Sequence, residues 1–251
     1  MDDVINPIVF MYVNINGKPV PLITDAAIVM CIISAVVIGM LWFFTRKLKD
    51  IPDGAQNIAE IYVGFLNNFT QGMIGKAYKI FAPYVGMLLI FIALSNMVGI
   101  FDVIPSGKRL ATVLGNPQFD GIRLALEPPT KNFNVAVCLA LCTMFIFVFS
   151  EFRFKGVKGW SRGFYKPSPV FGFVKILDYV IRPISLSLRL FGNIMGGFIV
   201  MHLLYSFVPL IVPGIVGIYF DLFDGVLQAF VFVVLTSIYF GEAVETEIED
   251  E

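Results

Sequence analysis

The chain has 251 residues, of which 57% are hydrophobic and only 15% are charged, and its net charge is −1. Few soluble domains combine so much apolar with so little charged sequence, and the recurring apolar runs of about 20 residues match the length of a membrane-spanning helix. These runs are continuous rather than alternating, which argues against a membrane β-barrel.

The N-terminal quarter is predicted to contain one span and one surface helix. Residues 1–25 form a polar-to-mixed segment with a turn signal at Asn16-Gly17. A first span is predicted at 26–44, where a basic run ends it. Residues 53–79 are only partly apolar, with Ile and Phe at helical spacing, and they predict an amphipathic helix that lies on the membrane surface.

The middle of the chain contains two further predicted spans, at 80–101 and 133–149. A loop at 102–131, which holds four prolines and charges of both signs, separates them. A basic loop at 150–170 follows the third span.

The C-terminal part contains two long predicted helices. The first, at 171–207, is too long to cross a bilayer perpendicularly, and the last runs from 214 to 240, before an acidic tail at 242–251. The sequence therefore predicts an all-α polytopic membrane protein. It forms a single membrane domain with about five transmembrane helices, one amphipathic surface helix and two long tilted C-terminal helices.

The distribution of basic residues predicts the orientation. The segments 45–79 and 150–170 each contain five Lys or Arg residues, which places both in the cytoplasm. The N-terminus is then external and the C-terminus cytoplasmic, and 102–131 is external although it has four basic residues. No basic region precedes an apolar one at the N-terminus, so no cleaved signal peptide is expected.

The sequence offers no catalytic chemistry of its own. Its three cysteines, Cys31, Cys138 and Cys142, lie in apolar segments without metal-type spacing and are expected to be small core residues. No Ser/His/Asp grouping, complete phosphate loop, metal site or other cofactor site is recognisable. The chain is interpreted as a conduit rather than a catalyst, with no nucleic-acid partner.

Arg189 is the most informative residue, because it lies in an apolar stretch with no opposite charge within one turn of sequence. A guanidinium cannot lose its proton, and its placement near a bilayer centre costs at least about 2.5–3.5 kcal/mol. Lys175, Arg182 and Arg189 are spaced by seven residues, so they share one stripe of the helix.

Small and polar residues continue that stripe. Ser185 precedes Arg189 by four residues, and Asn193 and Gly196 follow it by four and seven. Gly192 and Gly196 also match the small-xxx-small pattern that lets another helix approach closely. Two readings remain open: these glycines pack helices within the chain, or the arginine face meets a moving partner.

Four other polar residues are candidates for an ion path. His202, the only histidine, lies about 140° around the helix from Arg189 and is either a hydrogen-bonded core residue or a proton relay. Asp221, Asp224 and Gln228 share a face of the last helix. The aspartates are either solvated residues at a helix start or a wet entrance for cations. If the last two helices pack antiparallel, Gln228 reaches the depth of Arg189.

Four motifs resemble those of subunit a of F-type ATP synthases, over about residues 25–241. They are Ser187-Leu-Arg-Leu-Phe-Gly-Asn193, Phe81-Ala-Pro-Tyr84 with Ser95-Asn-Met-Val-Gly99, Pro129-Thr-Lys-Asn-Phe-Asn-Val135, and Leu227-Gln-Ala-Phe-Val-Phe-Val-Val-Leu-Thr236.

The resemblance implies a stator subunit beside a rotor ring of small subunits, each with a carboxylate in the membrane. Ions enter by one half-channel, ride on the ring and leave by a second, offset half-channel. Arg189 faces the ring, supported by Gln228 and flanked by a rotor-facing stripe of Ser185, Gly192 and Gly196. The implied ion-path residues are Asn193, Asp221, Asp224 and His202, with Lys175, Asp178 and Arg182 as a candidate cytoplasmic half-channel. Peripheral-stalk subunits, the lipid bilayer and a bacterial plasma (inner) membrane are the implied surroundings.

Some positions depart from the commonest family pattern. Phe198 occupies a position that is often ionisable, Lys175 one that is often acidic, Asn132 one that is often Asp, and Asp221 one that is often His or Glu. The choice between protons and sodium is not readable, and protons are the default. The rivals are a self-contained cation transporter, against which the lack of internal repeats argues, and a purely structural scaffold.

Overall fold

The computed structural model describes residues 9–15, 18–46, 54–99, 128–162, 169–207, 216–217 and 219–245. Within these ranges, the side chains are described everywhere except at 9–15, 18–25, 158, 162, 169–171, 202, 205–206 and 221. The predicted loop at 102–131 therefore lies outside the described residues apart from its last four positions.

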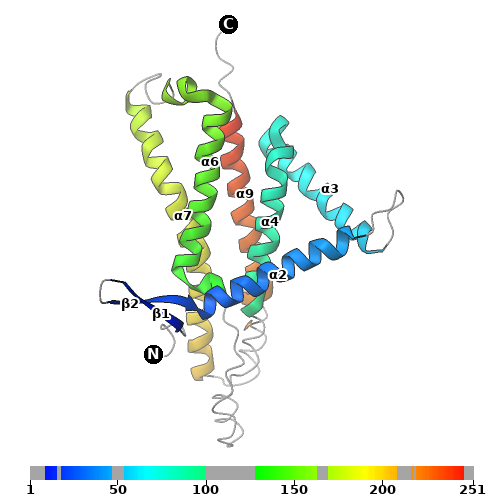
Figure 1. Cartoon of the computed structure of the whole chain (residues 1–251), viewed down its shortest axis with the longest axis vertical. Coiled ribbons are helices and arrows are strands. Elements are labelled where there is room, and N and C mark those ends of the chain that lie inside the picture. Colours follow the sequence, from blue (N-terminus) through cyan, green and yellow to red (C-terminus); the bar gives the residue numbers. More distant parts are fainter. Residues whose placement is uncertain are drawn as a thin grey trace, which may run out of the picture. The chain divides into compact units, whose positions relative to one another are not determined.

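The described chain is almost entirely helical (Figure 1). Its elements, in order, are β1 (Val9–Ile15), β2 (Lys18–Thr24), α2 (Asp25–Thr45), α3 (Ala55–Ile74), η1 (Gly75–Ala77), α4 (Tyr78–Met97), η4 (Pro129–Lys131), α6 (Phe133–Arg162), α7 (Pro169–Phe207), the π-helical η5 (Tyr219–Asp224) and α9 (Gly225–Val244). Five segments are long and apolar enough to cross a membrane, one of which joins α3 to α4. This confirms the predicted polytopic α-helical class.

An N-terminal hairpin is an addition that the sequence analysis did not predict. Strands β1 and β2 pair antiparallel, with Ile15 opposite Lys18 and Val9 opposite Thr24. The Asn16-Gly17 dipeptide between them is a typical two-residue hairpin connection. Because two isolated strands are marginally stable, this signal is easily read as a simple turn.

Helix α6 extends well beyond the predicted end of the third span. It continues from residue 149 to Arg162, through most of the segment predicted as a basic loop. The helix bends at Gly156, whose φ of 67° and ψ of 167° lie in a region that favours glycine. The basic residues of this segment are thus mostly presented on a helix.

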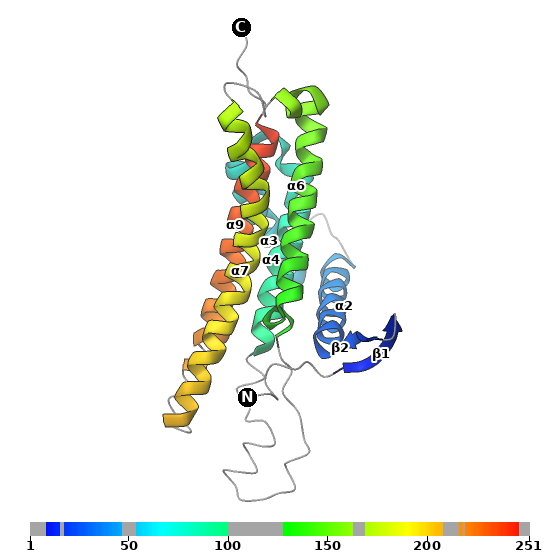
Figure 2. The same cartoon turned by 90° about the vertical axis from the view of Figure 1, so that its left-hand side faces the viewer.

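The chain divides into two compact units, of which the second contains 41–90, 133–191 and 229–251. Its helices α4, α6, α7 and α9 run alongside one another in Figures 1 and 2. Phe81 stacks on Phe240 at 4.6 Å between ring centroids, and the hydroxyls of Tyr84 and Thr143 lie 3.0 Å apart. The core of this unit therefore joins α4, α6 and α9.

The predicted amphipathic helix is α3, which folds back on α4. Tyr62 donates a hydrogen bond to the carbonyl of Gly86, and Leu66 is buried against the same turn. Ile58, Ile61 and other apolar residues of α3 remain exposed, as a membrane-surface helix requires. Its position on the membrane surface stays a prediction.

The first unit contains 1–40, 91–132 and 192–228. It comprises the hairpin, the start of α2, the end of α4, η4, the end of α7 and the start of α9. Val29, Ile33 and Val37, at i, i+4 and i+8, form the buried face of α2, and Ile92 is fully buried on α4. This unit is joined by the polar contacts described below.

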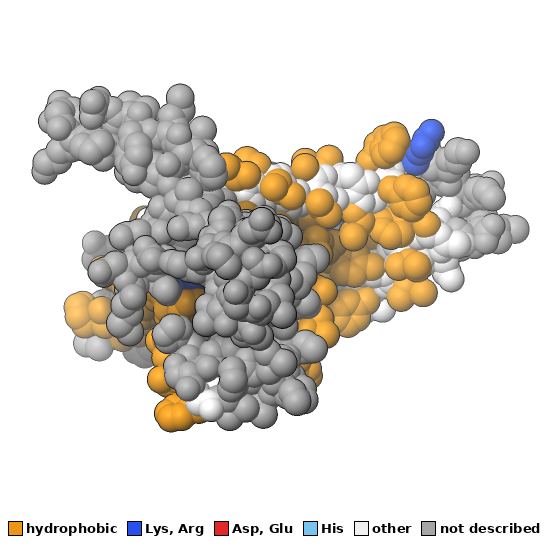
Figure 3. All heavy atoms as spheres, turned by 90° about the horizontal axis from the view of Figure 1, so that it is seen from below, with side chains coloured by type: hydrophobic (Ala, Val, Ile, Leu, Met, Phe, Trp, Pro, Cys, Tyr) orange, Lys and Arg blue, Asp and Glu red, His pale blue; other side chains and the backbone are white. Residues whose placement is uncertain are grey.

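Hydrophobic side chains dominate the outer surface as well as the core. They predominate among the coloured side chains of Figure 3, and Phe145 on α6 is 74% exposed. The three cysteines are also exposed, which corrects their expected place in the core. A lipid-facing surface is as apolar as a core, so hydrophobicity alone does not separate the two.

The close approach of α9 to the end of α3 generates a first prediction. A Cβ at Gly241 would lie 2.5 Å from the carbonyl oxygen of Met73, so Gly241→Ala forces the backbones apart and lowers stability by about 1–3 kcal/mol. Gly39→Ala is the control, because its Cβ would meet no atom of the described part of the chain within 4 Å. We expect a lower thermal midpoint for the first variant alone, and equal midpoints would contradict this packing.

Candidate functional site

Arg189 lies in the middle of α7 with an exposed side chain. Leu186 and Leu190 on either side of it are buried at 2% and 0% exposure, so the helix is firmly packed on one face and open on the other. Among the described residues, Arg189 forms no ion pair within 4.0 Å. The described part of the chain therefore supplies no counter-ion for this guanidinium.

The glycines near Arg189 differ in their surroundings. A Cβ at Gly192 or Gly196 would meet no atom of the described residues within 4 Å. A Cβ at Gly197 would instead lie 3.4 Å from the ring of Phe220. Gly197 is therefore the glycine that packs within the chain, whereas Gly192 and Gly196 leave space beside α7. This favours the reading in which their face meets a partner.

The other predicted ion-path residues occupy varied environments. Gln228 on α9 is 7% exposed, and its buried Nε2 has no hydrogen-bond partner among the described residues. Asn193 and Asp224 are half-buried. The side chains of His202 and Asp221 lie outside the described part of the structure. Because Arg189 and Gln228 belong to different units, their proximity stays a prediction.

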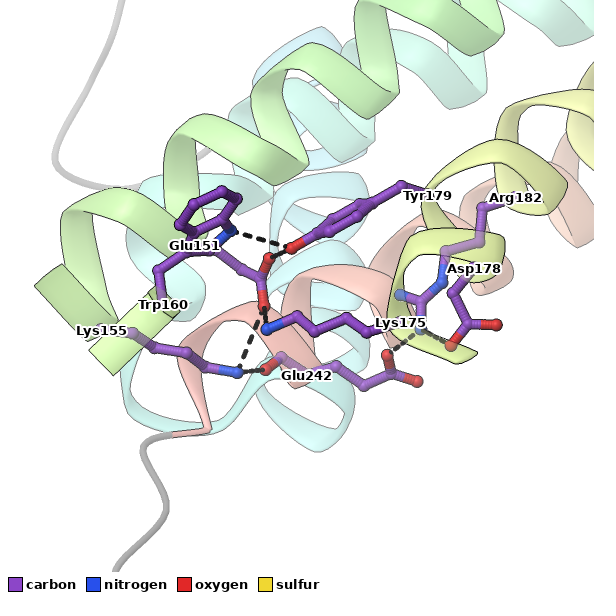
Figure 4. Close-up of polar contacts among 8 residues, drawn as sticks. All are labelled: Glu151, Lys155, Trp160, Lys175, Asp178, Tyr179, Arg182 and Glu242. Carbon is purple, nitrogen blue, oxygen red and sulfur yellow. Dashed lines mark hydrogen bonds and ion pairs between the residues drawn. The ribbon is translucent and has the colours of Figure 1, made fainter. Parts of the chain in front are cut away.

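The predicted cytoplasmic group on α7 comes together with carboxylates that the sequence analysis missed. Lys175, Asp178 and Arg182 line one cavity of about 200 Å³ together with Glu151 of α6 and Glu242 of α9 (Figure 4). Phe147, Lys155 and Tyr179 complete its lining. Helices α6, α7 and α9 thus contribute three cations and three carboxylates to the wall of this cavity.

Glu242 joins the end of α9 to α6 and α7. Its carboxylate lies 2.5 Å from Arg182 Nη2, and its backbone carbonyl accepts a 2.8 Å hydrogen bond from Lys155 Nζ. Arg182 also reaches Asp178 at 3.7 Å and stacks over Tyr239, 4.6 Å from the ring centroid. A lysine at the negative end of a helix is electrostatically favourable, so this corner fixes α9 against α6 and α7.

A second cluster of polar contacts, formed by Asn96, Thr130 and Gly225 and called the Asn96 joint, lies within the first unit. The side chain of Asn96, 4% exposed, donates a 2.9 Å hydrogen bond to the carbonyl of Gly225 and accepts one of 2.9 Å from Thr130. A Cβ at Gly225 would lie 2.9 Å from that of Asn96. This contact places the start of α9, one turn before Gln228, against α4 and η4.

Phe198, one of the departures from the family pattern, contacts a charged group. Lys131 Nζ lies 3.9 Å from the centroid of the Phe198 ring, a cation–π distance. Lys131 belongs to the Pro129–Val135 motif, but this contact was not predicted from the sequence. An aromatic ring, rather than an ionisable group, thus faces a cation at this point of α7.

Comparison with known proteins decides the family. The model of the ATP synthase A chain family matches residues 27–241. The chain belongs to this family. It is 33% identical over 195 residues to the sodium-ion-specific ATP synthase subunit a of Propionigenium modestum, covering 78% of this chain and 65% of that protein. It is 32% identical over 219 residues to the ATP synthase subunit a of Gloeobacter violaceus, covering 85% of this chain and 81% of that protein.

Family membership agrees with the five apolar segments, and the chain is a multi-pass membrane protein. The structure also gives a physical role to two motifs that carried the resemblance. Asn96 belongs to the Ser95–Gly99 motif and Thr130 to the Pro129–Val135 motif, and both meet at the start of α9. These motifs therefore hold the helix that presents Gln228.

This joint generates the second prediction. Asn96→Ala leaves the Gly225 carbonyl and the Thr130 hydroxyl without their buried partner, which costs about 1–3 kcal/mol. Asn68→Ala is the control, since Asn68 is exposed on α3 and such surface changes stay within about 0.5 kcal/mol. The thermal midpoint of the purified complex should fall for Asn96→Ala only. Similar midpoints for both variants would show that the joint adds no stability.

Proposed function

We propose that the chain is the stator subunit of the membrane sector of an F-type ATP synthase. In this proposal it provides two offset half-channels that carry protons to and from carboxylates on a rotor ring. Ion flow between the half-channels passes through the ring and is thereby coupled to rotation. The chain contributes no bond-forming chemistry, and the complex as a whole acts as the ion-translocating ATP synthase.

The observation that carries the proposal is the exposed face of α7 around Arg189. An obligatory cation lies there without a counter-ion among the described residues, and Gly192 and Gly196 leave room for a close neighbour. A charge that is expensive to insert and is left unpaired on an open face suits a counter-ion that arrives on another subunit. The rotor carboxylates are that counter-ion in our proposal.

Arg189 acts in two ways in this mechanism. It favours the ionised form of an approaching rotor carboxyl group, so the bound ion is released there. It also blocks direct passage between the half-channels, because a fixed positive charge in a low-dielectric region repels cations. Each charge that crosses 100 mV carries about 2.3 kcal/mol, which a direct leak would dissipate as heat.

The half-channels are assigned to the two ends of the helices. The external path involves Asp221, Asp224 and His202, and the cytoplasmic path involves Lys175, Asp178 and Arg182. The cavity of about 200 Å³ between α6, α7 and α9 supports the second assignment. Asn193 and Gln228 add neutral polar groups near the arginine, and Ser185 extends the rotor-facing stripe.

The proposed surroundings follow from the same role. The partners are the rotor ring on the Arg189 face, peripheral-stalk subunits and the lipid that covers the apolar outer surface. We place the N-terminus outside and the C-terminus in the cytoplasm of a bacterium, because both strongly basic segments then face inward. The charged cavity consequently opens toward the cytoplasm.

Replacement of Arg189 tests the proposal directly. Arg189→Ala should reduce ATP synthesis to background while the complex still assembles, because the exposed side chain contributes little to packing. Arg153→Ala is the matched control, as Arg153 is an exposed arginine on α6. ATP synthesis and subunit content are measured in the same membranes. An assembled Arg189→Ala complex with normal coupled synthesis would refute the mechanism.

The identity of the ion needs a separate measurement, since one relative is sodium-specific. We expect that sodium at fixed pH leaves the ATP hydrolysis rate of the intact complex unchanged, because protons load the rotor. Choline chloride at the same ionic strength controls for screening of surface charges. Stimulation by sodium but not by choline would instead assign sodium as the transported ion.

A further inference from the structure

We propose that Glu151 is the proton-exchanging carboxylate of the cytoplasmic half-channel, a role that the sequence analysis did not assign. This inference rests on the proposed function and names a residue of α6 for the inner path. Glu151 would accept a proton that leaves the rotor during ATP synthesis and pass it to cytoplasmic water.

The burial of Glu151 separates it from the other carboxylates of the cavity. Its side chain is 4% exposed, compared with 48% for Asp178 and 47% for Glu242. Buried acidic residues are rare unless they are paired, and a charge in this position is costly without partners. A buried carboxylate that still borders a cavity is placed to exchange protons with water in that cavity.

The partners of Glu151 hold both of its oxygens. Oε1 lies 3.4 Å from Lys175 Nζ and 3.5 Å from Lys155 Nζ. Oε2 accepts a hydrogen bond from the Tyr179 hydroxyl, which in turn accepts one of 3.0 Å from Trp160 Nε1 (Figure 4). The bend at Gly156 lets Trp160 return to α7. The carboxylate is therefore fixed in one orientation at the cavity wall.

The charges around the cavity balance one another when Glu151 is ionised. Lys155 projects from α6, and Lys175, Asp178 and Arg182 from α7, while Glu242 comes from α9. With Glu151 ionised, three cations face three carboxylates. A proton bound to Glu151 would leave the cations in excess by one, so the net charge of the cavity wall depends on this residue.

The position of the cavity suits an exit path from the rotor face. Arg182 on its wall is seven residues from Arg189, and Lys175 is fourteen. These separations correspond to about 10 Å and 21 Å along α7, at 1.5 Å per residue. All of these residues belong to the same compact unit. In this proposal, a proton released beside Arg189 therefore meets the cavity within about two to four turns of α7.

The transfer conserves atoms and charge without a cofactor. A hydrated proton from the rotor side binds a Glu151 oxygen, forming an O–H bond and releasing the lysine contact. That bond then breaks as cytoplasmic water accepts the proton and the carboxylate regains Lys155 and Lys175. During ATP hydrolysis the steps run in reverse. Sodium fits this site poorly, because two ammonium groups flank the oxygen that would bind it.

The test uses ATP-driven proton pumping by the holoenzyme in inverted membrane vesicles. Glu151→Gln keeps the size and hydrogen-bonding reach of the side chain but cannot take up a proton, whereas Glu151→Asp keeps the carboxylate but shortens its reach. We expect pumping per assembled complex to fall about a hundredfold in the Gln variant, the lower end for a positioned proton-transfer group. The Asp variant should keep more activity than the Gln variant. Its pumping should also depend differently on cytoplasmic-side pH from that of the wild type.

Glu60→Gln controls for the loss of one carboxylate, because Glu60 is exposed on α3. The opposite ranking, with Gln near the wild-type rate and Asp impaired, would assign Glu151 a structural role and overturn the proposal. A sodium-driven complex would overturn it too. Arg189→Ala in the same assay distinguishes failure of the role proposed for Glu151 from failure of the proposed function. If Arg189→Ala abolishes pumping and Glu151→Gln pumps normally, only the inference about Glu151 fails. If Arg189→Ala itself pumps normally, the proposed function is refuted.

Discussion

The structure depends on one constraint: a charged or polar group inside an apolar helix bundle needs a defined partner. Within the described residues, most such groups have one. Asn96 bridges Thr130 and the Gly225 carbonyl, and Glu151 lies between Lys155, Lys175 and Tyr179. These contacts also join helices that are distant in sequence. The polar groups therefore gain their partners only when the helices pack together. Gln228 and Arg189 differ: the buried Nε2 of Gln228 has no hydrogen-bond partner among the described residues, and the exposed Arg189 has no ion-pair partner among them. In our proposal the partner of Arg189 is a carboxylate of the rotor ring.

Charge is balanced differently in the cavity bordered by Glu151 and at Arg189. In the cavity, three cations face three carboxylates. At Arg189 the positive charge is permanent, and no described carboxylate neutralises it. The same helix, α7, contributes Lys175, Arg182 and Arg189 at intervals of seven residues. In our proposal, a single helical stripe thus combines a zone that passes protons with a point that repels them.

The sequence predicted the helices well because apolar length is a strong signal for a membrane span. The sequence was less informative where one residue pattern is compatible with two different structures. The exposed cysteines show that lipid-facing and core positions have the same hydrophobicity, and the basic residues after 149 indicate a loop although α6 continues to Arg162. The hairpin at Val9–Thr24 was missed although Asn16-Gly17 favours it.

The candidate site was predictable in part for the same physical reason. Arg189 and Gln228 are recognisable because polar residues within a span are rare, and Lys175 and Arg182 because they share its stripe. Glu151 could not be recognised, since it stands at the start of a basic segment and in sequence resembles an interfacial acid. Its burial arises only when Tyr179 and Lys175 of α7 pack against α6. The feature that gives Glu151 its proposed role in proton transfer is thus a tertiary contact, whereas the feature that identifies Arg189 is local composition.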